Sequence, residues 1–520
     1  MASLPLLSID DVGAHNKLDD LWLVVDNVVY DMTEFAQNHP GGVEVLLRFA
    51  GRDATRVYNS VHGPSLISSE LDATKHKGRL DVGTITPQWA STAMASDADA
   101  DGGDAQKQKE RTPLDEIVNL SDFAAAAEPV LPVQAWSYVS TGTEDNITRD
   151  ANTELLRRIW LRPAVLRDVS LPRMDLRTTL FGTVPLKMPV YVAPTGATRT
   201  GGKDGELAIA RGASAAGIMQ VISTVASYPY NEILAQMPSA EDGGQAMFQL
   251  YVDRDHRRSE ALLTKLLAGP HGRKIKAVLV TVDLPVSSKR EADERARALI
   301  AKKRDAALGI VPDGKKKEAG IARLNSSFID SAFSWEDLKW LRKTVDAAVA
   351  QHPQGPPPAP LPILAKGIQR AEDARLAMQH GCQGIVVSNH GGRAADTASP
   401  AILTLLEMHR CCPEVFGRIE ILIDGGFRRG SDVLKAICLG ASAVGMGRPF
   451  VYSVGYGQAG VEQAASILYD EILTTMRLCG LTNLMRDASP DYVNTGDIDH
   501  MVMSSLHHPY AKKPVWPAKL

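Results

Sequence analysis

From residue 190 to residue 446, short apolar runs alternate with stretches that have the composition of helices, such as residues 205–216 and 371–380. Glycine, proline or polar turn residues bound each run. The eight runs are residues 190–193, 218–222, 247–252, 277–282, 363–365, 384–387, 419–423 and 443–446. Eight strand-then-helix units in succession predict an α/β fold, a (β/α)8 barrel. A doubly wound sheet is the alternative, but eight sequential units fit a closed barrel better.

A smaller unit with a different pattern precedes the barrel. Residues 21–25 and 28–30 are apolar and flank an Asp-Asn pair, a spacing that predicts a β-hairpin. We assign residues 1–85 to this small α+β unit. Residues 86–113 lose hydrophobicity, and the run Ser-Asp-Ala-Asp-Ala-Asp-Gly-Gly-Asp within them predicts a flexible linker.

The barrel domain is expected to span residues 114–505, and a tail of residues 506–520 follows it. One connection is much longer than the others, because residues 291–327 form a stretch rich in Lys, Arg, Glu and Ala. A connection of this length is usually a functional lid or a disordered insertion. We expect a charged lid, and a solvated helix followed by a loop is the plainer interpretation.

Charge and apolar content exclude several classes of protein. The 57 basic and 61 acidic residues give a net charge of −4, which argues against a nucleic-acid binder that relies on bulk charge. No run of ~18 apolar residues occurs, so no membrane span is expected. Residues 1–15 contain two acidic residues and no Lys or Arg, which argues against a secretory signal or transit peptide. The five cysteines form no Cys-x-x-Cys pair, so we expect free, buried thiols in a reducing compartment.

Two histidines in the N-terminal unit have the spacing of a haem site. His39 opens the sequence His-Pro-Gly-Gly after Phe35, and His62 follows 23 residues later. Histidines on opposite walls of an apolar pocket can supply both axial ligands of a haem iron, and glycines let the chain approach the macrocycle. Two surface histidines on an unrelated small fold are the alternative.

The stretch from Tyr30 to Phe35, running into residues 39–42, resembles the signature of cytochrome b5-type haem-binding domains. This resemblance covers residues 4–85. It implies a non-covalent haem b that is used for electron transfer, with His39 and His62 as its iron ligands.

Reactive side chains follow the predicted barrel strands, at the rim where barrel active sites form. His390 and Arg393 follow the sixth run: an imidazole can take a proton near neutral pH, and a guanidinium can hold a carboxylate in its planar fork. Asp283 and Arg290 follow the fourth run, where they could orient the imidazole and complete the carboxylate clamp. Each could be structural alone, but their joint placement at strand ends favours a site.

Other strand ends add groups suited to a phosphorylated cofactor. The ends of the seventh and eighth strands are rich in glycine and arginine, which is the usual phosphate site of a barrel. Residues 388–393 read Ser-Asn-His-Gly-Gly-Arg, and with residues 193–195, 281–283 and 424–426 they resemble the FMN-dependent 2-hydroxy-acid dehydrogenase and oxidase family. The resemblance covers residues 114–290 and 328–505. Within that family, the haem-fused flavocytochrome b2 type of L-lactate dehydrogenase joins both units in this order.

The resemblance implies FMN and haem b as cofactors and a role for each matching residue. The catalytic set comprises the base His390, its orienting carboxylate Asp283, the carboxylate clamp Arg290 and Arg393, and the substrate-contacting tyrosines Tyr138 and Tyr251. The residues that match FMN contacts are Ala193, Thr195, Ser223, Gln249, Thr281, Lys366, Ser388, Asp424, Gly425, Gly426, Arg428, Gly447 and Arg448. The resemblance places Lys366 beside flavin N1 and O2.

Two positions by the expected flavin face are smaller than in the lactate-specific relative. Gly196 stands in place of alanine, and Val225 stands in place of leucine. Each missing methylene-sized group enlarges the space for the substrate's side chain and is worth ~1 kcal/mol of burial. We therefore expect an L-2-hydroxy acid as substrate, either L-lactate or a bulkier acid such as L-mandelate. A neighbouring side chain that refills the space is the alternative.

The reaction expected from the resemblance is oxidation of the 2-hydroxy acid to the 2-oxo acid, with electrons passing from FMN through haem to an acceptor such as cytochrome c. An oxidase that uses O2 directly is the alternative, and a haem module tethered to an inactive barrel is a third. We expect a homotetramer. The chain ends in Ala518-Lys519-Leu520, which resembles the C-terminal peroxisomal tripeptide, and no mitochondrial presequence is seen, so the expected location is peroxisomal or cytoplasmic.

Overall fold

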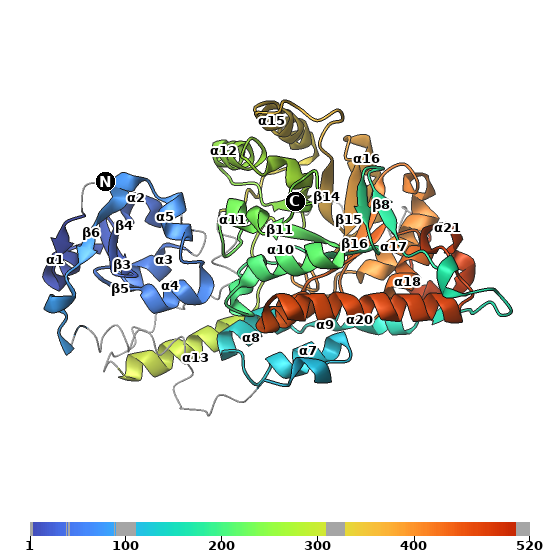
Figure 1. The fold of residues 1–520 in the computed structure, drawn as a ribbon, viewed down its shortest axis with the longest axis horizontal. Helices are drawn as coiled ribbons and strands as arrows, with labels where there is room; N and C mark the ends of the chain where they lie inside the picture. The colour runs from blue at the N-terminus through green and yellow to red at the C-terminus, as the bar shows by residue number, and fades with distance from the viewer. Residues whose placement is uncertain are drawn as a thin grey trace, which may run out of the picture.

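The computed structural model describes residues 4–87, 89, 111–307 and 328–505, except residues 38, 40 and 41. Within these residues the chain forms a small α+β unit and a barrel, which lie side by side (Figure 1). Most of the expected linker and all of the expected tail lie outside the described residues.

Eight parallel strands close into a barrel, because the first of them, β10, pairs with both β11 and β17. The strands are β10 (Val190–Val192), β11 (Met219–Ser223), β12 (Ala246–Leu250), β13 (Ile275–Thr281), β14 (Ile363–Ile368), β15 (Gly384–Val387), β16 (Glu420–Asp424) and β17 (Ala443–Met446). Each predicted apolar run overlaps one strand, so the predicted barrel is confirmed and a doubly wound sheet is excluded. The strands read as nearly continuous apolar runs because they are buried both inside the barrel and beneath its helices.

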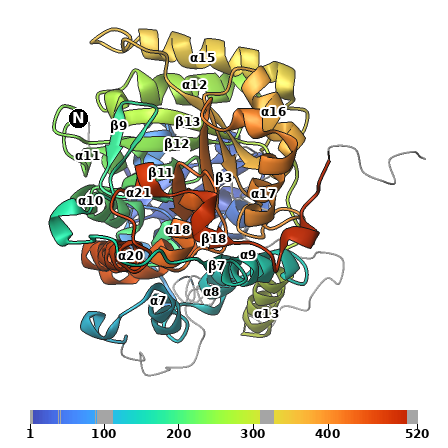
Figure 2. The same ribbon diagram turned by 90° about the vertical axis from the view of Figure 1, so that its right-hand side faces the viewer.

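Helices cover the outside of the barrel (Figure 2). They are α10 (Gly205–Ala216), α11 (Tyr230–Ala235), α12 (His256–Leu267), α15 (Leu338–Ala350), α16 (Ala371–Gln379), α17 (Ala401–Cys411), α18 (Gly430–Cys438), α19 (Arg448–Ser453), α20 (Gly457–Leu478) and α21 (Leu484–Asp487). The hairpin of β8 (Thr178–Leu180) and β9 (Val184–Leu186) closes one end, because its apolar side chains join the same core cluster as Tyr191 and Leu364 from inside the barrel. The hairpin does not cover the opposite end of the barrel, which is formed by the carboxyl ends of the strands.

Three helices precede the first barrel strand, namely α7 (Leu120–Ala127), α8 (Val133–Ser140) and α9 (Ile147–Arg157). Helix α13 (Glu291–Ala307) opens the long connection and lies beside α8 (Figure 1). Two of its charged residues, Asp293 and Arg297, are buried. The start of the expected lid is therefore packed against the protein, and residues 308–327 lie outside the described residues.

The N-terminal unit is built on the predicted hairpin, β3 (Asp20–Val25) and β4 (Val28–Asp31). Asp26 and Asn27 have φ values of 50° and 61°, the left-handed backbone that a tight two-residue hairpin turn requires. The remaining elements are β1 (Leu6–Leu7), β2 (Asn16–Lys17), β5 (Arg52–Asp53), β6 (His76–Leu80), α1 (Ile9–Ala14), α2 (Thr33–Ala36), α3 (Val43–Arg48), α4 (Thr55–Val61) and α5 (Leu66–Glu70). Its sheet runs in the order β1-β6-β4-β3-β2.

Two further sequence expectations concern membranes and thiols. Among the described residues, no helix has the length and apolar character needed to cross a bilayer. All five cysteines are free, and all but Cys411 are buried, as expected.

Candidate functional site

A cavity opens at the carboxyl ends of the barrel strands and holds about 1160 Å3 of space between atoms, its mouth included. The predicted residues that line it are Tyr138, Ala193, Thr195, Gly196, Ser223, Val225, Gln249, Tyr251, Arg290, Lys366, His390, Arg393, Asp424, Gly425, Gly426, Arg428, Gly447 and Arg448. The other three, Thr281, Asp283 and Ser388, lie one layer behind the wall and hold residues that line it.

His390 is held in a fixed orientation at the end of β15. Its φ of 60° is rare for a residue with a side chain and is the kind of strain that occurs at functional sites. The backbone N–H donates to the Ser388 hydroxyl at 3.1 Å, and ring atom Nδ1 lies 3.0 Å from the Asp283 carboxylate. An ionised Asp283 therefore selects the tautomer that carries its proton on Nδ1 and leaves Nε2 free to act as a base.

Burial favours a neutral imidazole at His390, and it stands beside an ionised carboxylate. Burial lowers the pKa of His390, and Asp283 opposes that shift without cancelling it. Burial alone would raise the pKa of Asp283, but the charge and hydrogen bond of His390, together with the charge of Lys366, hold it below its usual value. The Tyr251 hydroxyl lies 3.3 Å from Nε2, and burial raises its pKa, so it stays protonated and can donate to a bound oxygen. His390 is thus ready to accept a proton at neutral pH.

The two arginines expected to bind a carboxylate lie over the ring of Tyr138, at 5.3 Å for Arg290 and 5.5 Å for Arg393. Both donate to the Tyr138 carbonyl, and Arg393 also donates to the Val139 carbonyl at 2.6 Å. The Nε atom of each is buried and finds no hydrogen-bond partner among the described residues. Burial and its neighbour Arg393 lower the pKa of Arg290. An anion between the two would supply the missing acceptor and relieve the repulsion.

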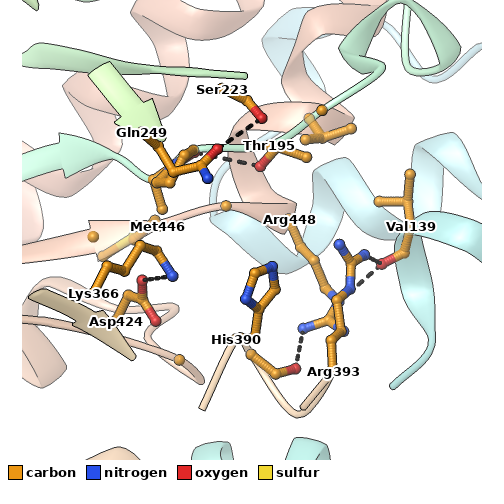
Figure 3. Close-up of a pocket in the computed structure, with 18 of the residues that line it drawn as sticks. Val139, Thr195, Ser223, Gln249, Lys366, His390, Arg393, Asp424, Met446 and Arg448 are labelled. Carbon is orange, nitrogen blue, oxygen red and sulfur yellow. Dashed lines mark hydrogen bonds and ion pairs between the residues drawn. The ribbon is translucent and has the colours of Figure 1, made fainter. Parts of the chain in front are cut away.

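Side-chain hydrogen bonds link neighbouring strands across the floor of the cavity. The Gln249 side chain accepts from the Ser223 hydroxyl at 3.0 Å and donates to the Thr281 hydroxyl at 3.0 Å, which links β11, β12 and β13. Lys366 lies 3.6 Å from the Asp424 carboxylate, and both are buried (Figure 3). These amide, hydroxyl and ammonium groups match the polar edge of a flavin ring, so the floor fits FMN.

The far side of the cavity suits a phosphate. Arg428 and Arg448 are both enclosed, and burial followed by the charges of Arg393 and Arg428 lowers the pKa of Arg448 well below its usual range. A Cβ at Gly426 would lie 2.4 Å from the Asn152 backbone, so only glycine allows the chain to pass there. A dianion would offset this buried positive charge. Three carbonyls, those of Val139, Thr141 and Gly391, already accept hydrogen bonds from Arg448. The bond to Val139 is drawn in Figure 3.

The two small residues expected to enlarge the substrate pocket touch each other. A Cβ added at Gly196 would lie 2.3 Å from Val225 Cγ2 and 3.0 Å from the Val225 carbonyl oxygen. Val225 therefore already occupies the space that the absent methyl leaves. A neighbouring side chain thus refills part of the room, as the alternative expected, so the two changes do not simply add.

The expected haem ligands face each other in the N-terminal unit. The ring centroids of His39 and His62 are 6.2 Å apart, which leaves room for an atom bound by a ring nitrogen at ~2 Å on each side. The Nδ1 atom of His39 lies 3.2 Å from the Gly42 carbonyl, which leaves Nε2 available as a ligand. Burial lowers the pKa of His39 and lowers that of His62 to about 3, so both rings are neutral as ligation requires. The pair fits a bis-His haem.

Two supports of the site were not found in the sequence. Asn152 in α9 and Asn389 exchange side-chain hydrogen bonds at 2.9 Å in full burial, and Asn152 also caps α17 through the Ala401 N–H. Backbone carbonyls of Val139 and Thr141 hold the arginines. An asparagine inside a helix and a carbonyl group carry no sequence signal that could have identified them.

Comparisons with known proteins agree with this geometry. Residues 127–495 match the model of the family described as FMN-dependent dehydrogenase, and residues 8–84 match that of the cytochrome b5-like haem/steroid binding domain. The chain is 36% identical to an L-lactate dehydrogenase (cytochrome) of Wickerhamomyces anomalus over 95% of this chain and 80% of that one. It is 35% identical to glycolate oxidase 3 of Arabidopsis thaliana over 75% of this chain and 100% of that one.

A solved structure resembles most of the chain. It is a double mutant of flavocytochrome b2 with pyruvate bound, with a TM-score of 0.63 and 33% identity over 79% of this chain and 93% of that one. The glycolate oxidase covers a smaller share of this chain than the cytochrome-linked dehydrogenase does. The chain therefore belongs to the FMN-dependent dehydrogenase family and carries a cytochrome b5-like haem-binding domain in front of its FMN-binding barrel.

Proposed function

We propose that this protein oxidises an L-2-hydroxy acid to the 2-oxo acid and passes the electrons to a one-electron acceptor such as cytochrome c. One observation carries the proposal: His390, oriented by buried Asp283, stands beside two arginines whose Nε atoms find no hydrogen-bond partner in the part of the chain that the structure describes. This is an arrangement for binding a carboxylate and taking a proton from the carbon or oxygen next to it. FMN supplies the two-electron oxidation when bound, and haem b supplies one-electron transfer.

Different residues of the chain bind the substrate, accept its proton and stabilise the charge that develops. Arg290 and Arg393 fix the substrate carboxylate in one orientation, which converts the encounter with the base into a positioned reaction. His390 Nε2 takes the proton, and Asp283 stabilises the imidazolium that results. Tyr251 donates to an oxygen of the substrate from the same side. Lys366 supplies a buried positive charge at the floor, which favours negative charge that develops there.

Replacing His390 with glutamine is expected to slow flavin reduction by roughly 10²–10⁴-fold with little loss of substrate affinity, because the base is removed while the arginines remain. The measurement is anaerobic stopped-flow reduction of the flavin at several substrate concentrations. His256→Gln is a matched control, because His256 forms the same kind of pair with Asp330 outside the cavity at 2.8 Å. Near-normal flavin reduction by His390→Gln would contradict the assignment.

The pH profile gives an independent check of the same pair. Because the pKa of His390 is lowered, the base is already deprotonated near pH 6.5, and kcat/KM should fall only on acidification below that point. Asp283 raises the pKa of His390, so Asp283→Asn should lower the rate and move the acid limb to still lower pH. An acid limb of the kcat/KM profile that shifts to higher pH in Asp283→Asn would rule out this electrostatic coupling.

Replacing either haem ligand should separate the two half-reactions. His62→Ala and His39→Ala are expected to lose the haem spectrum while the flavin is still reduced by substrate, since the two sites lie in different units. His76→Ala is a matched control in the same unit, because His76 meets the Tyr30 ring edge to face at 5.0 Å and is not one of the proposed ligands. Loss of flavin reduction along with the haem would show that the units do not work separately.

The pocket around Gly196 and Val225 is proposed to accept L-lactate and also larger acids, including L-mandelate. Gly196→Ala would push Val225 back toward the substrate, because the new methyl has no other space. This variant should lower kcat/KM for L-mandelate and L-2-hydroxyoctanoate by about 10-fold or more, because a steric change in a tight pocket costs ~1–3 kcal/mol of transition-state binding. The kcat/KM for L-lactate, the smallest of the three acids, should change least. Strong lactate preference in the unaltered protein, with no turnover of either larger acid, would refute the open pocket.

Acceptor, assembly and location complete the proposal. We propose cytochrome c or another one-electron acceptor rather than O2, a homotetramer, and a peroxisomal or cytoplasmic location. Turnover measured with cytochrome c and with O2 in one assay decides the acceptor, and light scattering of the holoenzyme decides the assembly. Residues 518–520 lie outside the described residues, and an unchanged location of the full chain after their removal would dismiss the peroxisomal signal.

A further inference from the structure

Two short turns form the side of the barrel that touches the N-terminal unit. One holds Gly196 and leads into η6 (Thr198–Thr200), and the other follows β11 through Val225 to Tyr228. The Ala197 N–H donates to the Val225 carbonyl at 3.0 Å, so the turns move together. Buried Glu206 strengthens the link, because one of its oxygens accepts from the N–H groups of Thr198 and Ser227.

The outer ends of these turns form hydrogen bonds with the segment that carries His62. Arg199 Nε donates to the Asn59 carbonyl at 2.6 Å, and the Gly63 N–H donates to the Ser227 carbonyl at 2.6 Å. Arg199 itself is held by the Tyr228 hydroxyl, which accepts from it at 2.5 Å and donates to the Lys203 carbonyl at 2.6 Å. Its guanidinium also lies 5.6 Å from the Tyr228 ring centre.

Gly63 fits this contact only because it lacks a side chain. A Cβ there would lie 2.4 Å from Cδ1 of Tyr228, well inside contact distance. The Gly63 carbonyl accepts from the Tyr58 hydroxyl at 3.1 Å, which ties the same turn to the ring that packs against His62. The chain next to the haem ligand is therefore shaped to lie directly on the barrel.

The contact also joins the two sites along the chain. Val225 lines the cavity, and two peptide units farther on the Ser227 carbonyl accepts from Gly63, which is bonded to His62. Only one hydrogen bond interrupts this path between the cavity wall and the haem ligand. Electron tunnelling weakens far more slowly along bonds and hydrogen bonds than across an open gap, so a path of this kind favours transfer.

We propose that Arg199 and Tyr228 form a docking clamp that positions the haem-binding unit for electron transfer, and that the Ser227–Gly63 hydrogen bond is the bridge between the two sites. This inference rests on the proposed function for its electron donor. The clamp residues act through Gly63 and Asn59, so they position the unit and do not touch the reacting atoms. A second contact, Lys265 with Glu70 at 2.9 Å, is exposed and contributes little to docking.

The kinetic test uses the full-length holoenzyme under anaerobic conditions. Arg199→Ala should leave flavin reduction by L-lactate unchanged and slow haem reduction about 10-fold or more, since it removes charge-assisted hydrogen bonds to the docked segment. Lys265→Ala is the matched control, because it removes a cation from a different contact between the same two units, and its rates of flavin reduction and haem reduction should both stay at the wild-type value. Haem reduction at the wild-type rate in Arg199→Ala would overturn the clamp.

A size-complementation pair tests the bridge without removing a charge. Gly63→Ala should slow haem reduction because its methyl would push the unit away from Tyr228, and adding Tyr228→Ala should restore part of the rate. The haem spectrum of each variant checks that the ligands are intact. Normal haem reduction in Gly63→Ala, or no recovery in the double variant, would contradict a bridge at this contact.

Hydrogen exchange tests docking without any turnover. In the oxidised full-length protein, a peptide covering residues 58–66 should exchange faster in Arg199→Ala and Gly63→Ala than in wild type, while a peptide covering β3 should not change. Equal exchange would overturn the clamp even if the kinetics were altered. If no 2-hydroxy acid reduces the flavin, the proposed function fails while the exchange result still decides whether the clamp exists.

Discussion

Closure of the barrel by the pairing of β10 with β17 is the constraint on which the site depends. It brings eight strand ends to one rim, and the β8–β9 hairpin seals the opposite end. Residues separated by more than 200 positions, such as Ala193 and Arg448, then share one cavity. The strands can be wholly apolar because the chemistry lies where they end, and loops that carry function do so on a rigid support.

Within that rim, buried charges are arranged to be balanced by a ligand. Arg290, Arg393, Arg428 and Arg448 lie close enough that burial and mutual repulsion lower the pKa of Arg448, while Lys366 and Asp424 form a pair of their own. Four buried guanidinium groups in one site are costly unless anions balance their charge. A substrate carboxylate and a cofactor phosphate are the anions that these positions suit, so the cost of burying the arginines is offset on binding.

The sequence predicted the strands, the hairpin and 18 of the 28 residues that line the cavity, because apolar runs report burial directly and the motif residues stand at strand ends. The sequence did not predict which side chains pack against each other between distant segments. Val225 fills the gap beside Gly196, and Asn152 holds Asn389 from another helix. The contact of Arg199 with Asn59 joins two units, and neither residue belongs to a motif. Such contacts depend on the packing of distant segments, which periodicity cannot report.

In the mechanism proposed above, electrons released in the cavity pass to the haem within one chain. The most direct measurement is anaerobic mixing of the oxidised protein with L-lactate, followed at the flavin and haem absorbance bands over a tenfold range of protein concentration. We expect the flavin to be reduced first and the haem to follow at a rate independent of protein concentration. Haem reduction that speeds up in proportion to protein concentration, or a haem that stays oxidised beside a reduced flavin, would contradict this mechanism.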